Sequence, residues 1–224
     1  MPKVYLSPSN QTENRYAYGS TNEAEQCGRI AEASRKALER SGVTVKLGHM
    51  PSMQEKVRAS DAFGAELHVP IHTNAFNGSV MGTRMFCYNT GKGMAACKAI
   101  FTRVAPLSPG TSENIQVNPK LYEVRVPKAP TAYIECEFHD TVEGARWIVE
   151  NAAAIGEAIA RGICDCFGVT FVESEPPKPA QPEQPAEQKL YRVQVGAFAS
   201  RANAEKMVQR LKEAGFDAFI RQDA

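Results

Sequence analysis

The sequence predicts an α/β fold, with a mostly parallel twisted sheet and helices on both faces. Two observations predict it. Short apolar and β-branched runs alternate with longer segments of helical periodicity along residues 3–168. Residues 67–75 begin as a continuous apolar run and end in the polar sequence His72-Thr73-Asn74. That pattern is typical of a buried parallel strand whose carboxyl end carries functional side chains.

Each element has its own local signal. β-branched or apolar runs predict strands, and apolar stripes at spacings of three and four predict helices. Thr21 or Asn22 caps the first helix, Gly42 ends it, and Gly82 suggests a bend within a later strand. The expected strands cover residues 3–8, 43–47, 67–75, 80–88 and 131–138. The expected helices cover residues 22–41, 52–63 and 93–104, with a long last helix along Ile148, Ala152, Ile155, Ile159 and Ile163. Residues 107–130 are Pro-rich and polar, which predicts a long irregular loop of functional importance.

A change of composition divides the chain into three parts. Residues 1–172 form the expected main domain, and residues 173–188 are a Pro-rich linker without apolar periodicity. Residues 189–224 predict a small β-α-β unit, with strands over residues 190–196 and 216–221 around a helix that Ser200 caps. A unit of this size needs a partner surface or a second copy to be stable.

The composition excludes several classes of protein. A net charge of +1 gives no electrostatic basis for binding nucleic acid or a membrane surface. No apolar run is long enough to span a bilayer, and the first residues lack the apolar segment of a secretory signal, so we expect synthesis in the cytoplasm. The six cysteines form no Cys-x-x-Cys pair, which predicts reduced thiols rather than a disulfide framework.

Polar side chains gather at the ends of three expected strands. Asn10 and Gln11 follow the first, His72 ends the third, and Glu135 lies in the strand over residues 131–138. Glu23 lies in the first turn of the first helix, where a carboxylate also complements the helix dipole. Zinc takes three protein ligands and a water, so His72 and Glu23 are candidate ligands and Glu135 a candidate proton shuttle.

Two alternatives follow from strand geometry. His68 shares a strand face with His72, but their Cα atoms are about 13 Å apart, too far for one metal, so His68 is expected to be structural. Glu135 and Glu137 share a face at roughly 6–7 Å. Paired carboxylates keep a glycosidase open, although neighbours on one strand are poorly placed to flank a scissile bond from opposite sides.

Residues 3–168 resemble the zinc-dependent N-acetylmuramoyl-L-alanine amidases of the Amidase_3 type. Residues 64–75 are similar to the family stretch that ends in Ser-Ile-His-x-Asn-Ala, and residues 130–138 to its Pro-Ala-hydrophobic-hydrophobic-Glu-x-Gly-Phe stretch. The resemblance implies a zinc-exopeptidase-like fold with Zn²⁺ as cofactor. It also implies that His72 and Glu23 bind the metal and that Glu135 is catalytic. The implied reaction cleaves the amide between the muramoyl lactyl group and L-alanine in peptidoglycan.

The sequence departs from the family at one metal ligand. The family opens with Asp-Pro-Gly-His-Gly-Gly, whereas this chain has Ser-Pro-Ser-Asn-Gln-Thr over residues 7–12. The third ligand is therefore Asn10 or Gln11 through an amide oxygen, or His139, or a water. Glu137 stands at a family glycine, and His139-Asp140 replaces Leu-Ser. His139 is accordingly expected near the site, as a ligand, a supporting group or a catalytic oxyanion donor.

Residues 190–221 resemble the first half of a SPOR domain, a module that binds peptidoglycan glycan strands. A half domain suggests a homodimer through this unit. The leading hypothesis is a cell-wall amidase that is released from the cytoplasm, either as a phage endolysin or as a mother-cell autolysin. The alternative is a catalytically inactive peptidoglycan-binding protein, which the missing histidine motivates. A metallopeptidase acting on cytosolic peptides is a third possibility.

Overall fold

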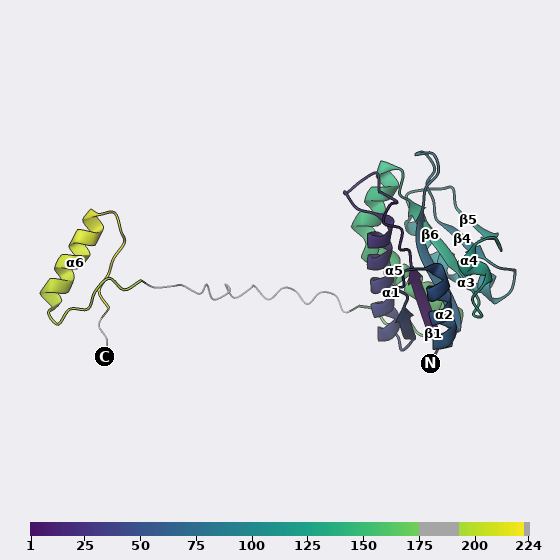
Figure 1. Cartoon of the computed structure of the whole chain (residues 1–224), viewed down its shortest axis with the longest axis horizontal. Coiled ribbons are helices and arrows are strands. Elements are labelled where there is room, and N and C mark those ends of the chain that lie inside the picture. The colour runs from purple at the N-terminus through teal and green to yellow at the C-terminus, as the bar shows by residue number, and fades with distance from the viewer. Residues whose placement is uncertain (175–192, 222–224) are drawn as a thin grey trace. The chain divides into compact units, whose positions relative to one another are not determined.

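The computed structural model describes residues 1–174 and 193–221. The chain divides after Ser174 into two units, and each is considered by itself (Figure 1). The first unit contains a six-stranded sheet in the order β2-β1-β3-β6-β4-β5. Its strands are β1 (Lys3–Pro8), β2 (Thr44–Leu47), β3 (Leu67–Asn74), β4 (Arg84–Cys87), β5 (Asn114–Val117) and β6 (Tyr133–Phe138). Its helices are α1 (Glu23–Arg40), α2 (Met53–Phe63), α3 (Lys92–Val104), the 3-10 turn η1 (Ala105–Leu107), α4 (Tyr122–Arg125) and α5 (Val142–Phe167).

The sheet is mostly parallel, as the sequence predicts. β2, β1, β3 and β6 run parallel, and β4 pairs antiparallel with β6 and parallel with β5. The reversal follows from the connection between β3 and β4, residues 75–83, which contains no helix. A parallel return needs a longer crossover, usually a helix.

The sheet has one apolar face and one polar face, because successive strand residues point to opposite sides. The apolar face carries Val4, Leu6, Val69, Ile71, Met85 and Ile134. It is covered by α1, α3 and α5, and α1 lies beside α5 in Figure 1. The polar face carries Tyr5, Ser7, His68, His72, Tyr133 and Glu135. Both α2 and α4 lie on this face, since Ser60 of α2 and Glu123 of α4 hydrogen-bond to His68. Helices on both faces are thus confirmed.

Local sequence signals explain most element ends. Asn22 caps α1 by accepting from the Glu25 N–H, and Ser52 caps α2 by accepting from the Glu55 N–H. Gly64 follows α2 with φ of 68°, a left-handed conformation that favours glycine. All six cysteines are free, and only Cys166 among them is exposed.

Two expectations for residues 80–130 are wrong. The strand expected over residues 80–88 is reduced to Arg84–Cys87. Gly82 explains the loss, because its φ of 141° breaks the extended backbone and a Cβ at this position would meet the backbone of Ser112. Residues 107–130 are not an irregular loop, since they contain β5 and α4. β5 is short and partly exposed, and pairing with β4 rather than a local pattern forms it.

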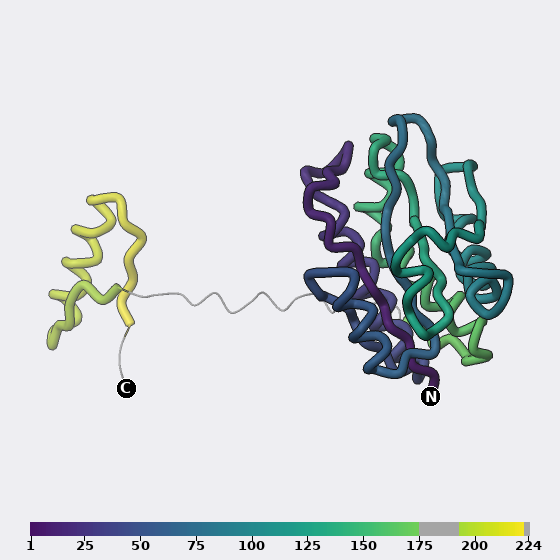
Figure 2. Tube along the Cα trace, turned by 45° about the vertical axis from the view of Figure 1, so that its right-hand side comes forward, coloured from purple at the N-terminus to yellow at the C-terminus, as the bar shows by residue number. Residues whose placement is uncertain are grey.

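The second unit consists of one helix with an arm on each side, as Figure 2 shows. Helix α6 (Arg201–Glu213) follows Ser200, as the sequence predicts, and Gly215 has a φ of 86°. The strands expected on either side are absent from residues 193–196 and 216–221, and residues 190–192 lie outside the described part of the chain. A pair of strands with no third neighbour is marginal in water. None of the described residues 193–221 is buried.

The described helices in both units are too short or too polar to cross a bilayer. The linker expected over residues 173–188 lies outside the described residues from Glu175 onward.

Candidate active site

Three neighbouring parallel strands bring the candidate side chains to one edge of the sheet. His72 of β3 stands opposite Glu135 of β6 in the strand register, so both side chains leave the same face. β1 ends at Pro8, two residues before Asn10 and three before Gln11. Helix α1 begins at the same edge with Glu23, because the Asn22 cap fixes the start of its first turn.

Glu23 and His72 form the centre of the site. The His72 Nδ1–H donates to Glu23 Oε1 at 2.8 Å, and both side chains are buried. Asn14 Nδ2 donates to the other carboxylate oxygen at 2.6 Å. Burial opposes both charges, but the mutual hydrogen bond prevails, so the pKa of Glu23 is lowered and the pKa of His72 is raised. In this arrangement two metal-type donors converge on one point.

Glu135 lies beside this pair with spare hydrogen-bonding capacity. Its Oε2 atom is buried and has no partner among the described residues, and the same holds for His72 Nε2. Burial raises the pKa of Glu135 to about 7, with His72 acting in the opposite direction. A carboxyl group with a pKa near neutrality can both accept and return a proton.

The two amides after β1 point in different directions. Gln11 Nε2 lies 3.5 Å from His72 Nδ1, and Gln11 Oε1 accepts from Asn14 Nδ2 at 3.1 Å. Asn10 turns away, donating from Nδ2 to the Pro51 carbonyl at 2.7 Å. The structure therefore brings Gln11 to the Glu23–His72 pair and does not bring Asn10 there.

His139 lies behind the site rather than in its centre. Its Nδ1 is hydrogen-bonded to Thr73 Oγ1 at 2.9 Å, and its ring stacks on Tyr16 with centroids 4.9 Å apart. Burial lowers the pKa of His139, so the neutral imidazole is favoured. Glu137 is also occupied elsewhere, because it accepts from the N–H groups of Gly82 and Phe138 and from Ser108. These contacts separate Glu137 from Glu135 and remove the basis for a glycosidase pair.

The donor types near His72 suit zinc. Ligand atoms about 2.0–2.1 Å from a tetrahedral zinc are about 3.3 Å from one another. The hydrogen bond of 2.8 Å between His72 Nδ1 and Glu23 Oε1 is shorter than that value, and Gln11 approaches His72 Nδ1 at 3.5 Å through its amide nitrogen, while its oxygen accepts from Asn14. In the part of the chain that the structure describes, no three His, Cys, Asp or Glu residues cluster, and the amide side chains of Gln11 and Asn14 lie beside the Glu23–His72 pair. Imidazole, carboxylate and amide oxygen fit a zinc ion, with a weaker third ligand than a second imidazole.

Sequence reasoning missed two residues of the site, Asn14 and Tyr133. Asn14 lies in a polar loop without a pattern, and only the folded chain shows that its amide bridges Gln11 and Glu23. Tyr133 stacks on His72 with ring centroids 4.8 Å apart. The sequence could have indicated Tyr133, because residues two apart on a strand share a face and Tyr133 precedes Glu135 by two.

Comparisons with known proteins identify the family and the fold of the chain. A family model described as N-acetylmuramoyl-L-alanine amidase (Amidase_3) matches residues 5–165, and a SPOR domain model matches residues 176–223. The sporulation-specific N-acetylmuramoyl-L-alanine amidase of Bacillus subtilis (strain 168) is 22% identical over 228 residues, covering 98% of this chain and 84% of that protein.

Two solved structures illustrate the similarity in fold. The catalytic domain of CwlV, an amidase from Bacillus (Paenibacillus) polymyxa var. colistinus, superposes with a TM-score of 0.69 at 15% identity, covering 76% of this chain and 100% of that chain. AmiC2 of Nostoc punctiforme gives a TM-score of 0.64 at 19% identity, covering 75% and 97%.

Proposed function

The chain belongs to the Amidase_3 family of N-acetylmuramoyl-L-alanine amidases and is a peptidoglycan hydrolase, and on this premise we propose a zinc enzyme with an unusual ligand set. His72, Glu23 and Gln11 hold the metal, and Glu135 is the catalytic base and acid. The convergence of Glu23, Gln11 and Glu135 on His72 supports the assignment. Gln11 is preferred over Asn10 and His139 because those two side chains are engaged with Pro51 and Thr73.

The chemistry divides between the metal and the side chains. A bound zinc lowers the pKa of a water to about 7 and polarises the scissile carbonyl. Glu135 accepts a proton from the attacking water at its unpartnered Oε2 and passes it to the departing nitrogen of L-alanine. Asn14 fixes the second oxygen of Glu23 and the amide of Gln11, which holds both donors in place.

The division of the chain supports a wall-bound enzyme. We assign residues 1–172 to the catalytic domain, 173–188 to the linker and 189–224 to the peptidoglycan-binding unit. Binding by the second unit raises the local concentration of the catalytic unit at an insoluble substrate. None of the described residues 193–221 is buried, and exposed Val193, Val195, Phe198, Phe216 and Phe219 support pairing with a second copy as a homodimer. The name of the Bacillus subtilis relative favours action on the wall of a sporulating mother cell over an endolysin role.

The test is zinc stoichiometry by elemental analysis of the purified full chain. We expect one zinc in the wild type, none in His72→Ala and a reduced content in Gln11→Ala. Asn10→Ala and His139→Ala are the matched controls and should retain zinc. In parallel, release of L-alanine amino termini from peptidoglycan should follow zinc content.

A wild type without zinc, even after incubation with the metal, would overturn the zinc assignment. If that protein still cosedimented with peptidoglycan sacculi, it would be an inactive wall-binding protein. Loss of zinc from His139→Ala with retention in Gln11→Ala would move the third ligand from Gln11 to His139.

A further inference from the structure

The polar face of the sheet carries a row of side chains that runs across the strands from the proposed metal site. His72 of β3 stands opposite Glu135 of β6, and Glu135 stands opposite Arg84 of β4. Arg84 in turn stands opposite Asn114 of β5. Residues paired in this way on neighbouring strands point to the same face of a sheet. The row therefore places a guanidinium one strand beyond the side chain that moves the proton.

The Arg84 side chain extends toward the edge of the sheet where the site lies. Its Cζ atom is 5.1 Å from the centroid of the Phe138 ring. Phe138 ends β6, and the register shift after His72 puts it opposite Asn74, on the polar face. Ser112, which precedes β5, accepts from Arg84 Nη2 at 2.9 Å through its hydroxyl and from Nε at 3.4 Å through its carbonyl. The ring and the serine together hold the guanidinium beside the carboxyl end of β6.

Arg84 has no counterion among the described residues. No ion pair within residues 1–174 or 193–221 includes it, and its side chain is half-buried. Its Nη1 atom also has no hydrogen-bond partner there, so the Nη1–Nη2 edge presents parallel N–H donors that match the two oxygens of a carboxylate. The next group in the row, Asn114 Oδ1, is buried and likewise has no partner in the described part of the chain. The row therefore has hydrogen-bonding capacity that no described residue uses.

The direction of the row places Arg84 on the peptide side of the scissile bond. In the proposed reaction Glu135 passes its proton to the departing nitrogen of L-alanine, so the peptide leaves on the Glu135 side of the metal. Arg84 lies further along the same line. Neighbouring strands are about 4.8 Å apart and an extended peptide advances about 3.3 Å per residue, so Arg84 is reached one to two residues after the scissile nitrogen. L-alanine has no free carboxylate inside a peptide stem, and the first one available belongs to the residue that follows it.

We propose that Arg84 is a specificity-determining residue of the hydrolase and binds a free carboxylate on the second residue of the peptide stem. Ser112 and Phe138 hold the guanidinium in the orientation for this contact. A stem in which that carboxylate is converted to an amide loses the ion pair and is cleaved less efficiently. This inference rests on the proposed function, because the role of Glu135 gives the direction in which the peptide leaves.

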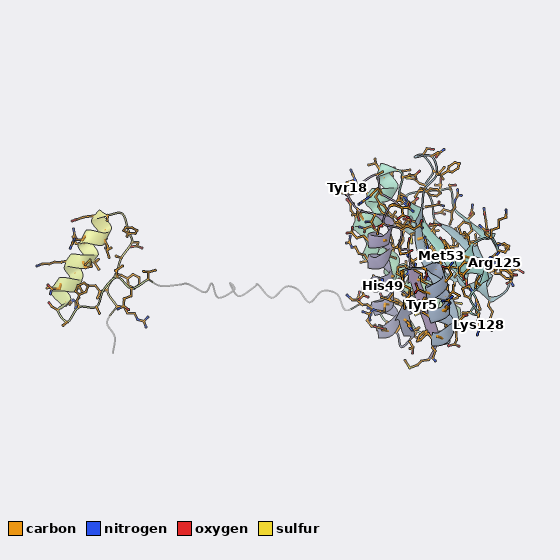
Figure 3. The ribbon with its side chains drawn as sticks, viewed as in Figure 1. Tyr5, Tyr18, His49, Met53, Arg125 and Lys128 are labelled. Atoms are coloured by element: carbon orange, nitrogen blue, oxygen red, sulfur yellow. The ribbon has the colours of Figure 1, made fainter. Side chains whose placement is uncertain are left out.

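Two soluble substrates test the proposal. N-acetylmuramoyl-L-alanyl-D-glutamate and N-acetylmuramoyl-L-alanyl-D-isoglutamine differ only in whether the carboxyl group nearest the scissile amide is free or amidated. The full-length wild type, Arg84→Gln, Arg84→Lys and Arg125→Gln are compared by kcat and KM on both. Arg125 of α4, labelled in Figure 3, is the matched control because it is exposed and forms no ion pair with a described residue. The Kd values of the released dipeptides, L-alanyl-D-glutamate and L-alanyl-D-isoglutamine, are measured by NMR titration and report binding without turnover.

We expect the wild type to have a kcat/KM about 10–100-fold higher on the D-glutamate substrate, the effect of one charged hydrogen-bonded pair, with most of the difference in KM. Arg84→Gln should cleave both substrates equally, at about the wild-type rate on the isoglutamine substrate. Arg84→Lys should keep part of the preference, because it retains the charge but not the paired N–H donors. Arg125→Gln should keep all of it. The preference is a ratio measured on one protein, so partial unfolding of a variant does not change it.

The opposite results overturn the proposal. Equal cleavage of both substrates by the wild type shows that the carboxylate is not recognised. An equal loss on both substrates in Arg84→Gln shows that Arg84 acts on Glu135 or on packing rather than on the peptide. Loss of the preference in Arg125→Gln makes it a general effect of surface charge. A chain that hydrolyses neither substrate refutes the proposed function instead, and the dipeptide Kd values then decide. A preference for L-alanyl-D-glutamate that Arg84→Gln abolishes would support the carboxylate site, and equal Kd values would overturn it.

Discussion

His68 and His72 lie on the same face of the same strand, yet their surroundings differ in one decisive respect. Both nitrogens of His68 are used, since Nδ1 is hydrogen-bonded to Ser60 at 3.0 Å and Nε2 donates to Glu123 at 3.2 Å. His72 uses Nδ1 with Glu23, and its Nε2 has no partner among the described residues. Glu135 beside it also has a buried oxygen without a partner.

Around His68 the ionisable side chains are paired, although the hydroxyls of Tyr5 and Thr131 beside it have no partner among the described residues. Glu123 also accepts from Ser7 at 2.5 Å, and Lys56 donates to the Pro8 carbonyl at 2.6 Å. Glu123 and His68 are fully enclosed. Buried ionisable groups are normally paired, so the unpartnered atoms of His72 and Glu135 make these two side chains candidates for a binding or catalytic role. The comparison therefore supports the proposal that His68 is structural and that His72, four residues away, is functional.

The largest expected effect is the loss of kcat when the Glu135 carboxylate is replaced. Glu135→Gln keeps the shape of the side chain but cannot accept a proton, so we expect kcat to fall by about 10²–10⁴-fold. Zinc content, by elemental analysis, should stay at the wild-type value because the carboxylate holds no metal. Loss of zinc from this variant would make Glu135 a ligand and contradict its assigned role.

The next prediction contrasts the effects of removing each histidine on stability and on zinc content. His68→Ala leaves Glu123 buried without its partner, which should cost about 3 kcal/mol or more and lower Tm by roughly 10 °C. Zinc content should be unchanged. His72→Ala should show the reverse, with zinc lost and a smaller change in Tm. Thermal melts and metal analysis of both variants make the test, and a loss of zinc from His68→Ala would break the comparison.

Short sequence patterns predicted the elements that depend on neighbouring residues. The carboxyl edges of β1, β3 and β6, the Asn22 cap and the α/β alternation all follow from short sequence signals. Long-range pairing carries no such signal, which is why β5 was missed and the strand before Arg84 was extended too far.

The same limit applies to the two networks around the histidines. Glu123 lies 55 positions from His68, and no periodicity connects them. In the site, Gln11 and Asn10 are adjacent in sequence and only the fold decides which amide faces His72. The sequence does not distinguish Glu135 from Glu137, because both lie on the same face of one strand. Only the fold shows that Glu137 accepts from the backbone N–H of Gly82.

A smaller effect should appear in the pH dependence of stability. Burial works to raise the pKa of Glu123, but hydrogen bonds from His68 and Ser7 lower it below the usual value. Folding therefore favours the ionised form, and the stabilisation is present above the unfolded pKa of about 4.3 and is lost as pH falls through the folded pKa.

Glu123→Gln should remove this dependence. The loss of stability relative to wild type should be largest near pH 7, on the order of 1–2 kcal/mol, and should shrink below pH 4. It is followed as the difference in Tm between the two proteins. Glu150→Gln, an exposed change on α5, is the control and should follow the wild-type curve. A constant difference between Glu123→Gln and wild type from pH 7 to pH 3 would show that packing, not charge, is responsible.

The smallest effect is expected from removal of the second unit. Deleting residues 175–224 preserves the contacts that end the first unit, including Val172 with Ser41 and Glu173 with Arg161. Zinc content, Tm and kcat on soluble muropeptides should therefore match the full chain. Activity on intact walls should fall by about tenfold, because the catalytic unit loses its raised local concentration at the insoluble substrate. Equal losses on walls and muropeptides would instead show that the second unit supports the fold of the first, and the polar network around His68 would then not suffice to stabilise it.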